Sequence, residues 1–189
     1  IVGVNKLTYG DQNTPCITGN GELVITGSGT LEIPNSSIFC KDLIMNGGAV
    51  LKVGTVLNVS GSVKVDSADI ESLYESQSGF MCCTGYSSDK SPKFAFNDAG
   101  LKLGLYFNGD TVLTNCNVTI ENAPLRAPAG VLTIEGGTFS LMQDEASPDP
   151  SLNVSHKAII KNAAIKTDSI WNINNLEMTS STFESTVPP

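Results

Sequence analysis

Two acidic residues that lie one apparent repeat apart are the first candidates for chemistry in this sequence. Glu22 and Asp42 are separated by 20 residues, and the segments around them share a hydrophobic pattern. If these segments stack as neighbouring parallel strands, the two side chains lie about 5 Å apart, close to the carboxyl separation of a retaining glycosidase. The alternative is that both carboxylates are solvated on a strand surface, as most acidic side chains are.

Seven other acidic side chains form two local groups. Asp66, Asp69, Glu71 and Glu75 lie close together in the chain, and the segment DEASPDP (Asp144–Pro150) forms a Pro-bounded acidic loop. The loop lacks the regular oxygen spacing of a dedicated calcium site. We therefore expect no cofactor and no structural metal, and at most weak Ca²⁺ binding.

Other catalytic signatures are missing from the sequence. It contains no P-loop, no dinucleotide-binding glycine motif and no HExxH zinc motif. The single His156 has no GxSxG nucleophile motif beside it. The single Arg126 lies between Pro124 and Pro128, which predicts a rigid loop and not a catalytic strand position.

Aromatic side chains are the main candidates for ligand binding. Seven of the twelve aromatic residues lie between Tyr74 and Phe107, and aromatic rings on exposed loops can stack on sugars. The alternative is that these rings pack a surface arm onto the rest of the fold, because aromatic residues chiefly contribute burial. The candidates for binding a glycan or host ligand are Tyr74, Phe80, Tyr86, Phe94 and Trp171.

The sequence contains five cysteines, and their spacing does not decide whether they form disulfides. They form no metal-type CxxC pair, so two disulfides with a spare thiol, or buried free thiols, are the two interpretations. Adjacent cysteines bond more readily to distant partners than to each other. The cysteines are Cys16, Cys40, Cys82, Cys83 and Cys116.

Composition narrows the fold and the partners. The 189 residues carry a net charge of −8 with a single Arg, which is unlike a nucleic-acid-binding protein. No apolar run is long enough to span a membrane. Gly, Asn, Ser and Thr make up more than a third of the chain, and these types favour turns and disfavour helix interiors. The length predicts one domain over residues 1–189. Within it, we expect an N-terminal cap over 1–15 and a linker over 186–189.

A repeat of about 20 residues organises the chain. Shifting the sequence by 20 places Leu23–Ile25 on Leu43–Met45 and Leu31–Ile33 on Leu51–Val53. The shift also places Glu32 on Lys52, a favourable pair between stacked strands. Stacked coils of this length would align the apolar side chains into continuous inner columns, so we expect six to eight coils of a β-solenoid.

The C-terminal half repeats a related pattern at intervals of 21, 26 and 18 residues. Four segments align on an Asn, Gly or Ser turn, followed three residues later by Val118, Phe139, Ile165 and Phe183. The longest interval contains the Asp144–Pro150 loop. Irregular loops in a roughly constant coil length are typical of solenoids, because each coil contacts mainly its neighbours.

The pattern fades over residues 66–105. Ile70, Leu73 and Tyr74 have the i, i+3, i+4 spacing of a helix, with Asp66 or Ser67 as a candidate N-cap. We therefore expect a lateral insertion here, with a short helix.

The segments VLTNCNVTIEN, VLTIEGGTFS and AIIKNAAIKT resemble coils of right-handed parallel β-helix proteins of the pectate-lyase-like superfamily. ITGSGTLEI and VLTIEGGTF are similar to solenoid segments of secreted bacterial cell-surface and adhesin-like proteins. The resemblance implies an all-β, right-handed parallel β-helix, and a β-sandwich is the rival fold.

The resemblance also implies a function. We expect a non-catalytic extracellular module of a bacterial surface or secreted protein, which binds a glycan or host ligand and belongs to a longer chain with flanking domains. One alternative is a polysaccharide lyase or glycoside hydrolase. A lyase of this family needs a basic residue beside calcium-binding carboxylates, and the expected loop position of Arg126 does not fit that role. The other is a phage tail-spike fragment, in which three parallel solenoids associate.

Overall fold

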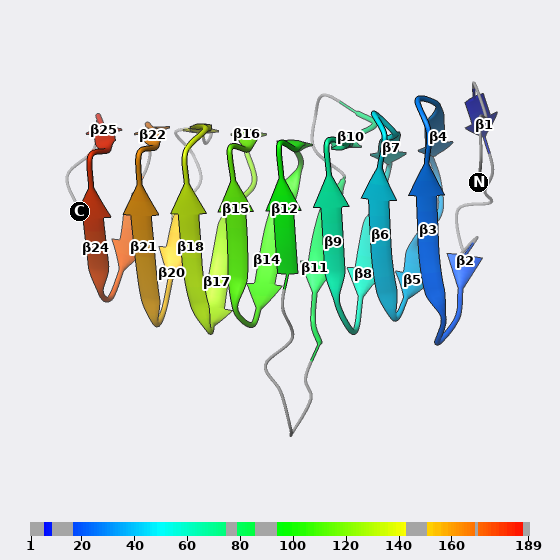
Figure 1. Cartoon of the computed structure of the whole chain (residues 1–189), viewed down its shortest axis with the longest axis horizontal. Helices are drawn as coiled ribbons and strands as arrows, with labels where there is room; N and C mark the ends of the chain where they lie inside the picture. The colour runs from blue at the N-terminus through cyan, green and yellow to red at the C-terminus, as the bar shows by residue number, and fades with distance from the viewer. Residues whose placement is uncertain are drawn as a thin grey trace.

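The computed structural model describes residues 6–8, 17–74, 79–85, 94–142, 151–168 and 170–186 of the chain. These residues form a parallel β-solenoid in which successive strands enter three sheets in turn (Figure 1). Every strand pair within the sheets is parallel, and the described residues contain no helix. The solenoid and the number of coils predicted from the repeat are confirmed.

The three sheets contain all 25 strands of the described residues. Sheet A consists of β3 (Glu22–Thr26), β6 (Asp42–Asn46), β9 (Val63–Asp66), β12 (Phe94–Asn97), β15 (Thr111–Thr114), β18 (Val131–Glu135), β21 (Lys157–Lys161) and β24 (Leu176–Thr179). Sheet B consists of β1 (Lys6–Thr8), β4 (Thr30–Ile33), β7 (Val50–Val53), β10 (Asp69–Ser72), β13 (Gly100–Lys102), β16 (Asn117–Glu121), β19 (Thr138–Met142), β22 (Ala164–Thr167) and β25 (Thr182–Ser185). Sheet C consists of β2 (Ile17–Thr18), β5 (Ile38–Cys40), β8 (Val56–Val59), β11 (Phe80–Cys83), β14 (Gly104–Asn108), β17 (Leu125–Ala129), β20 (Leu152–Val154) and β23 (Trp171–Ile173).

The strand register follows the 20-residue shift. Leu23 pairs with Leu43 and Ile25 with Met45 between β3 and β6, and Glu32 pairs with Lys52 between β4 and β7. The irregular C-terminal intervals are equally well placed, because Val118, Phe139, Ile165 and Phe183 form one continuous column on sheet B. Both predicted alignments are therefore confirmed.

Alternation along each strand separates the core from the surface. Strands such as β6 and β7 alternate buried and partly exposed residues, so every second side chain points into the coil. The inward side chains of the three sheets meet in one apolar core that runs the length of the stack. At its centre the ring of Phe107 lies 6.2 Å from that of Phe94 and 5.7 Å from that of Phe96.

The turn from sheet A to sheet B begins with the same backbone geometry in every described coil. A residue with positive φ follows each sheet A strand, in the left-handed region that Gly, Asn and Asp adopt most readily. In five of these turns its backbone N–H donates to a carbonyl of the next coil, as from Asn115 to Glu135 and from Asn162 to Thr179. The turn residues are Gly27, Gly47, Ser67, Asp98, Asn115, Gly136, Asn162 and Ser180.

The expected helix is wrong. Asp69–Ser72 is strand β10, with Ile70 directed into the core between Leu51 and Leu101. The coil pattern also continues in the described residues between 66 and 105, because β10 to β14 all pair in register with their neighbours. What differs is the length of one coil: Val63 pairs with Phe94, 31 residues later.

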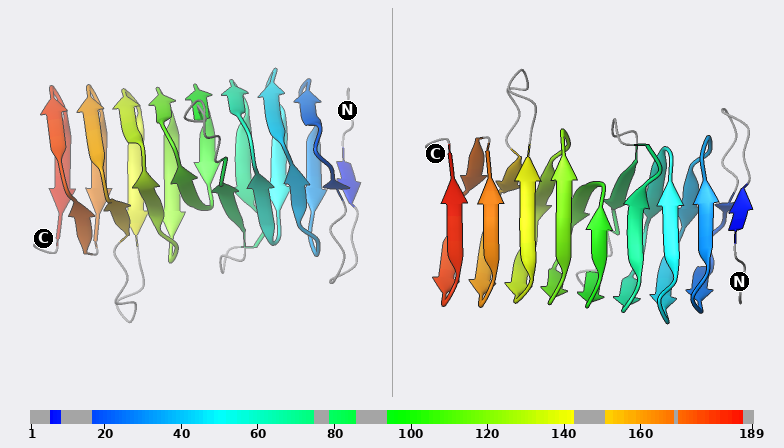
Figure 2. Two further views of the ribbon diagram at one scale, coloured as in Figure 1. Left: turned by 90° about the horizontal axis from the view of Figure 1, so that it is seen from below. Right: turned by 90° about the horizontal axis from the view of Figure 1, so that it is seen from above.

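The solenoid is elongated, with β1 and β25 at opposite ends of the stack (Figure 2). Of the predicted N-terminal cap, only Lys6–Thr8 is described, and it forms β1 beside β4. The rest of the cap, the loop at 144–150 and residues 187–189 of the predicted linker lie outside the described residues.

Candidate functional site

A groove on the outer face of sheet B contains Tyr74, the most exposed of the predicted binding residues that the structure describes. Its volume is about 410 Å³, and it lies where β7, β10, β13 and β16 run side by side. We call it the Tyr74 groove. It is lined by Lys52, Glu71, Ser72, Leu73, Tyr74, Lys102, Leu103, Thr119 and Glu121.

Tyr74 is held in a fixed position although its side chain is exposed. The residue is 41% exposed, and its Oη lies 3.3 Å from both the Pro34 carbonyl and Asn35 Oδ1, either of which can accept its proton. The ring edge passes close to Gly54, where a Cβ would meet Tyr74 Cε2 at 2.9 Å and would collide with the Pro34 carbonyl. Ser72 Oγ donates to the Tyr74 carbonyl at 3.0 Å. The ring is therefore an ordered aromatic surface that contacts water.

A ladder of alternating charges crosses the floor of the groove. Lys52, Glu71 and Lys102 occupy equivalent outward positions on β7, β10 and β13. Glu71 Oε2 lies 3.4 Å from Lys52 Nζ, and Glu71 Oε1 accepts a hydrogen bond of 3.0 Å from Lys102 Nζ. Each lysine can still donate to a ligand, because an ammonium group carries three protons.

The charges around Glu71 fix its protonation state. Burial disfavours the charged carboxylate, but the hydrogen bond from Lys102 and the charges of Lys102 and Lys52 outweigh this effect. The pKa of Glu71 consequently lies below its ordinary value of 4.5, and the hydrogen bond to Glu71 raises the pKa of Lys102. Glu71 is thus an ionised acceptor at neutral pH and unsuited to act as a general acid.

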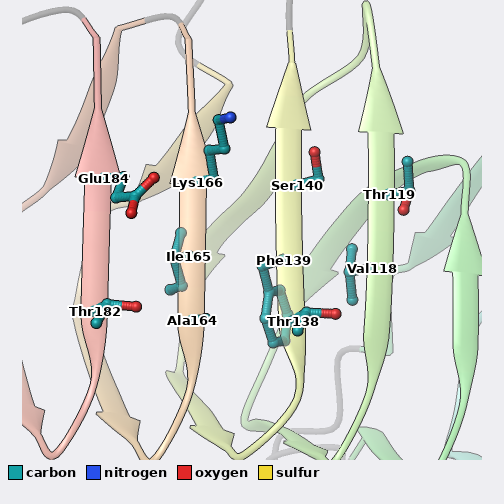
Figure 3. A pocket seen from close by; sticks show the side chains of 10 residues that line it. All are labelled: Val118, Thr119, Thr138, Phe139, Ser140, Ala164, Ile165, Lys166, Thr182 and Glu184. Atoms are coloured by element: carbon teal, nitrogen blue, oxygen red, sulfur yellow. The ribbon is translucent and has the colours of Figure 1, made fainter.

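A second hollow lies farther along the same face, over β16, β19, β22 and β25 (Figure 3). Its volume is about 230 Å³, and Ala164 forms a low point between the hydroxyl-bearing Thr138 and Thr182. Ser140, Lys166 and Glu184 continue the outward row in Figure 3. Thr119 lines both hollows, so they are neighbouring parts of one polar face.

The other predicted aromatic residues are not brought together with Tyr74. Phe94 is fully buried in the core, so its assignment to a binding surface is wrong. Phe80 lies on sheet C with its ring against Gly104, where a Cβ would clash with it. Tyr86 lies outside the described residues.

Trp171 has an inward position at the end of the solenoid. It pairs with Leu152 in an inner column of sheet C, and its ring lies 4.9 Å from that of Phe183. It shares its inward direction with Ile173 and packs against the core.

The acidic pair of Glu22 and Asp42 is stacked as predicted, with Cα positions paired between β3 and β6. Asp42 Oδ1 accepts hydrogen bonds of 2.7 Å from both the backbone N–H and the Oγ of Ser62. The backbone hydrogen bond is the largest of the effects that lower the pKa of Asp42. This carboxylate therefore serves the fold as an acceptor for the next coil, and its lowered pKa is the opposite of what a general acid needs.

The second acidic group is dispersed. Asp66 is on the outer face of sheet A, and Asp69 Oδ1 on sheet B accepts a hydrogen bond from the Gly100 N–H at 2.8 Å. Glu75 and the Asp144–Pro150 loop lie outside the described residues. Within the part of the chain that the structure describes, no group of three or more His, Cys, Asp or Glu side chains could hold a metal ion.

Arg126 differs from its prediction. It lies on strand β17 and pairs with Tyr106 and Asn153, not on a loop. Pro128 is accommodated in the same strand because the register between β14 and β17 shifts beside it.

The four described cysteines are free thiols, so no disulfide joins any two of them. Cys40, Cys83 and Cys116 point into the core, where burial is the main reason that their pKa values are raised, to about 11 for Cys40 and Cys116. Cys82 is half-buried on the outer face of sheet C, and burial raises its pKa as well. Cys16 lies outside the described residues.

Sequence reasoning missed the lysines of the Tyr74 groove. The pair Glu32 and Lys52 was visible at the 20-residue shift, but Glu71 follows Lys52 after 19 residues and Lys102 follows Glu71 after 31. Aligning the inward Leu51, Ile70 and Leu101 would have revealed the ladder, because each of these residues precedes a ladder residue.

The comparisons with known proteins identify no relative of this chain. No protein-family model matches the chain, and neither the curated proteins nor the solved structures contain a significant match. Among the described residues, no helix has the length and apolarity needed to cross a membrane. The three parallel sheets themselves support the resemblance to β-helix proteins at the level of architecture.

Proposed function

We propose that this chain is a non-catalytic module that binds a carbohydrate through the Tyr74 groove. The observation that carries the proposal is an aromatic ring, 41% exposed, that is held at the edge of sheet B by its hydroxyl group and lines a groove with charged donors and acceptors. Sugars are recognised by this combination, because their C–H faces stack on aromatic rings while their hydroxyl groups exchange hydrogen bonds with polar side chains.

The position of the groove favours a surface ligand over a buried one. Its floor is a flat parallel sheet, and the second hollow around Ala164 extends the polar face along the solenoid. We place the module outside the cell, as part of a bacterial surface or secreted protein, where a glycan or other host ligand would be its partner. This setting rests on the sequence resemblance, and the fold alone is compatible with many functions.

A non-catalytic role is favoured over hydrolysis by the state of the carboxylates. Glycoside hydrolysis needs one protonated and one ionised carboxyl group at the same bond. Glu71 and Asp42 both have lowered pKa values and are occupied by Lys or Ser partners.

The test is a binding screen against a panel of polysaccharides, by affinity electrophoresis and then calorimetry, with and without Ca²⁺. We expect Tyr74→Ala to weaken binding about tenfold or more, as for other central aromatic contacts. The matched control is Phe39→Ala, because Phe39 is 40% exposed but lies on sheet C. Equal losses in both variants, or no binding by the native chain, would contradict the proposal.

The same incubations test the catalytic alternative. Release of reducing ends or of unsaturated products by the native chain would show that it is a polysaccharide-active enzyme. We expect neither product, with or without Ca²⁺.

A further inference from the structure

The last described coil ends the solenoid with an open face, formed by β23, β24 and β25. Each of these strands pairs only with the preceding coil among the described residues, so one edge of each strand has no described neighbour. Met178 is 44% exposed although it occupies an inner column, and Leu176 is 37% exposed. The other inner side chains of this coil, Trp171, Ile173 and Phe183, are half-buried. Sheet edges with apolar side chains beside them pair readily with further strands.

The chain order gives the open face the shape of a ramp. The last coil passes through β23 in sheet C, β24 in sheet A and β25 in sheet B, and Figure 1 shows β24 and β25 at this end of the stack. Each complete coil advances along the solenoid by one strand separation, about 4.8 Å, so β25 stands farthest out and β23 least. A two-fold axis through β24, perpendicular to the solenoid axis, places β24 against β24 and β25 against β23 of a second copy. The high end of each ramp then meets the low end of the other, and all three strand contacts have equal separation.

A head-to-tail arrangement lacks this fit. Sheet B has nine described strands, whereas sheets A and C have eight each. If β23 and β24 of one copy continued into β2 and β3 of the next, then β25 and β1 would occupy the same position in sheet B. The open face is therefore complementary to the open face of a second copy and not to the opposite end of the solenoid.

The inward residues are compatible with this two-fold contact. Residues that face each other in an antiparallel pair point to the same side, which limits the possible registers. One of these registers centres the axis on Met178, which then faces its counterpart inside the core. The same register places Phe183 opposite Ile173 of the second copy, on both sides of the axis. The two apolar cores would then join into one.

The outward residues favour the same register. Glu177 faces Thr179 of the second copy, and Glu184 faces Asn172, so no two like charges lie opposite each other. Within each copy, Glu177 keeps its ion pair with Lys157 at 2.7 Å. A register centred on Glu177 would instead place two carboxylates directly opposite each other.

We propose that two copies of this chain associate through their open faces, with a two-fold axis through β24. The contact closes on itself, so it stops at a dimer. The Tyr74 groove lies over β7 to β16, away from the contact, and remains accessible in both copies. The dimer therefore does not depend on the proposed carbohydrate binding, and Tyr74→Ala should leave it intact.

The size of the open face predicts a weak dimer. It is one coil wide, so two such faces would bury roughly 1,000 Å² in total, which is at the low end for specific interfaces. The three strand pairs would add about ten backbone hydrogen bonds. We expect a dissociation constant roughly in the micromolar range, so that the chain is monomeric in more dilute solution.

The first measurement is sedimentation equilibrium of the native chain at roughly 1–100 µM. We expect a monomer–dimer equilibrium, and we expect Met178→Lys to weaken the dimer at least tenfold because two ammonium groups would face each other on the axis. Val24→Lys is the matched control, since Val24 is an apolar residue, 37% exposed, on the strand at the opposite end of sheet A. Circular dichroism of each variant shows whether the fold is retained. A native monomer at about 100 µM, polymers longer than a dimer, or an equal loss in both variants would overturn the proposal.

Cross-linking tests the axis itself and does not depend on the lysine variant being folded. Met178→Cys alone should form an intermolecular disulfide under mild oxidation, because position 178 faces itself across the axis. Val24→Cys and the native chain should not form one. No cross-link of Met178→Cys with itself, or a more efficient one between Met178→Cys and Val24→Cys in a mixture, would contradict the two-fold contact.

Discussion

Strands β6 and β24 carry the same inward pattern at different places in the stack. Leu43 and Met45 on β6 are fully buried, whereas Leu176 and Met178 on β24 are 37% and 44% exposed. Each pair occupies the same two inner columns of sheet A. The pattern Leu-x-Met therefore determines the direction of the side chains, while the presence of a coil on both sides determines their burial.

This difference matters for stability because a solenoid is held together by contacts between neighbouring coils. An inner residue with two neighbouring coils removes its whole side chain from water. One in the last described coil removes only part of it. The free energy of unfolding should therefore respond very differently to the same substitution at the two places.

Replacing the two methionines is the most direct test of this comparison. We expect Met45→Ala to cost about 2–5 kcal/mol, because it leaves a cavity in a packed core. Met178→Ala should cost less than about 1 kcal/mol, since nearly half of its surface already contacts water. Urea titration of both variants gives the two values.

Leu43→Ala and Leu176→Ala repeat the comparison one position along and should show the same order. Similar costs at β6 and β24 would mean that the inner residues of the last described coil are covered in solution.

Two glycines extend the comparison to the turns. Gly48 and Gly137 both have positive φ, near 80°, but a Cβ at Gly48 would meet nothing within 4 Å, while one at Gly137 would collide with the carbonyl of Cys116. We expect Gly48→Ala to cost about 1–2 kcal/mol from the backbone conformation alone. Gly137→Ala should cost roughly 2–4 kcal/mol because the neighbouring coil must also move.

Thermal unfolding of the two glycine variants provides the measurement. If Gly137→Ala were no worse than Gly48→Ala, the close contact between the coils at Cys116 would not exist in solution.

The smallest effects are expected on the surface of sheet B. Glu71→Gln should lower the stability at pH 7 by at most about 1 kcal/mol, because it removes the ion pairs with Lys52 and Lys102. Since the pKa of Glu71 is lowered in the folded chain, its stabilising effect is present above the ordinary value of 4.5 and is lost as the pH falls through the folded value. The difference between the native chain and Glu71→Gln should thus shrink below about pH 4.5.

Glu135→Gln is the control for that experiment. Glu135 has an ion pair with Lys161, at 3.2 Å, and its side chain is 45% exposed. Its replacement should change the stability at pH 7 less than that of Glu71. A larger effect at Glu135 would show that the ladder on sheet B is not the stronger arrangement.

Much of the fold was predictable because coil length is nearly constant over two parts of the sequence. The pairing of Leu31 with Leu51 and of Val118 with Phe139 followed from inward apolar residues at a fixed distance from small turn residues. The prediction failed at Ile70, where three apolar residues at helical spacing competed with an alternation of only four residues. The 31-residue step from Val63 to Phe94 then hid the register that would have settled the assignment.

The binding groove was predictable only in part. Tyr74 could be selected because it is an aromatic residue in an irregular region of the sequence. Phe94 met the same two criteria, but it is buried. The two differ in whether the residue falls on an inward position, and that depends on the register of a coil whose length the sequence did not reveal. The lysines beside Glu71 have the same dependence on register.

The buried thiols could report the order in which the coils of the solenoid separate during unfolding. Cys40 lies in an early coil, whereas Cys83 and Cys116 lie in the middle of the chain, and their raised pKa values keep all three as unreactive thiols in the folded state. A thiol reagent can modify each of them only after its own coil has separated from the neighbouring coils. The order in which the three react would therefore time the separation of successive coils without any label being added to the chain.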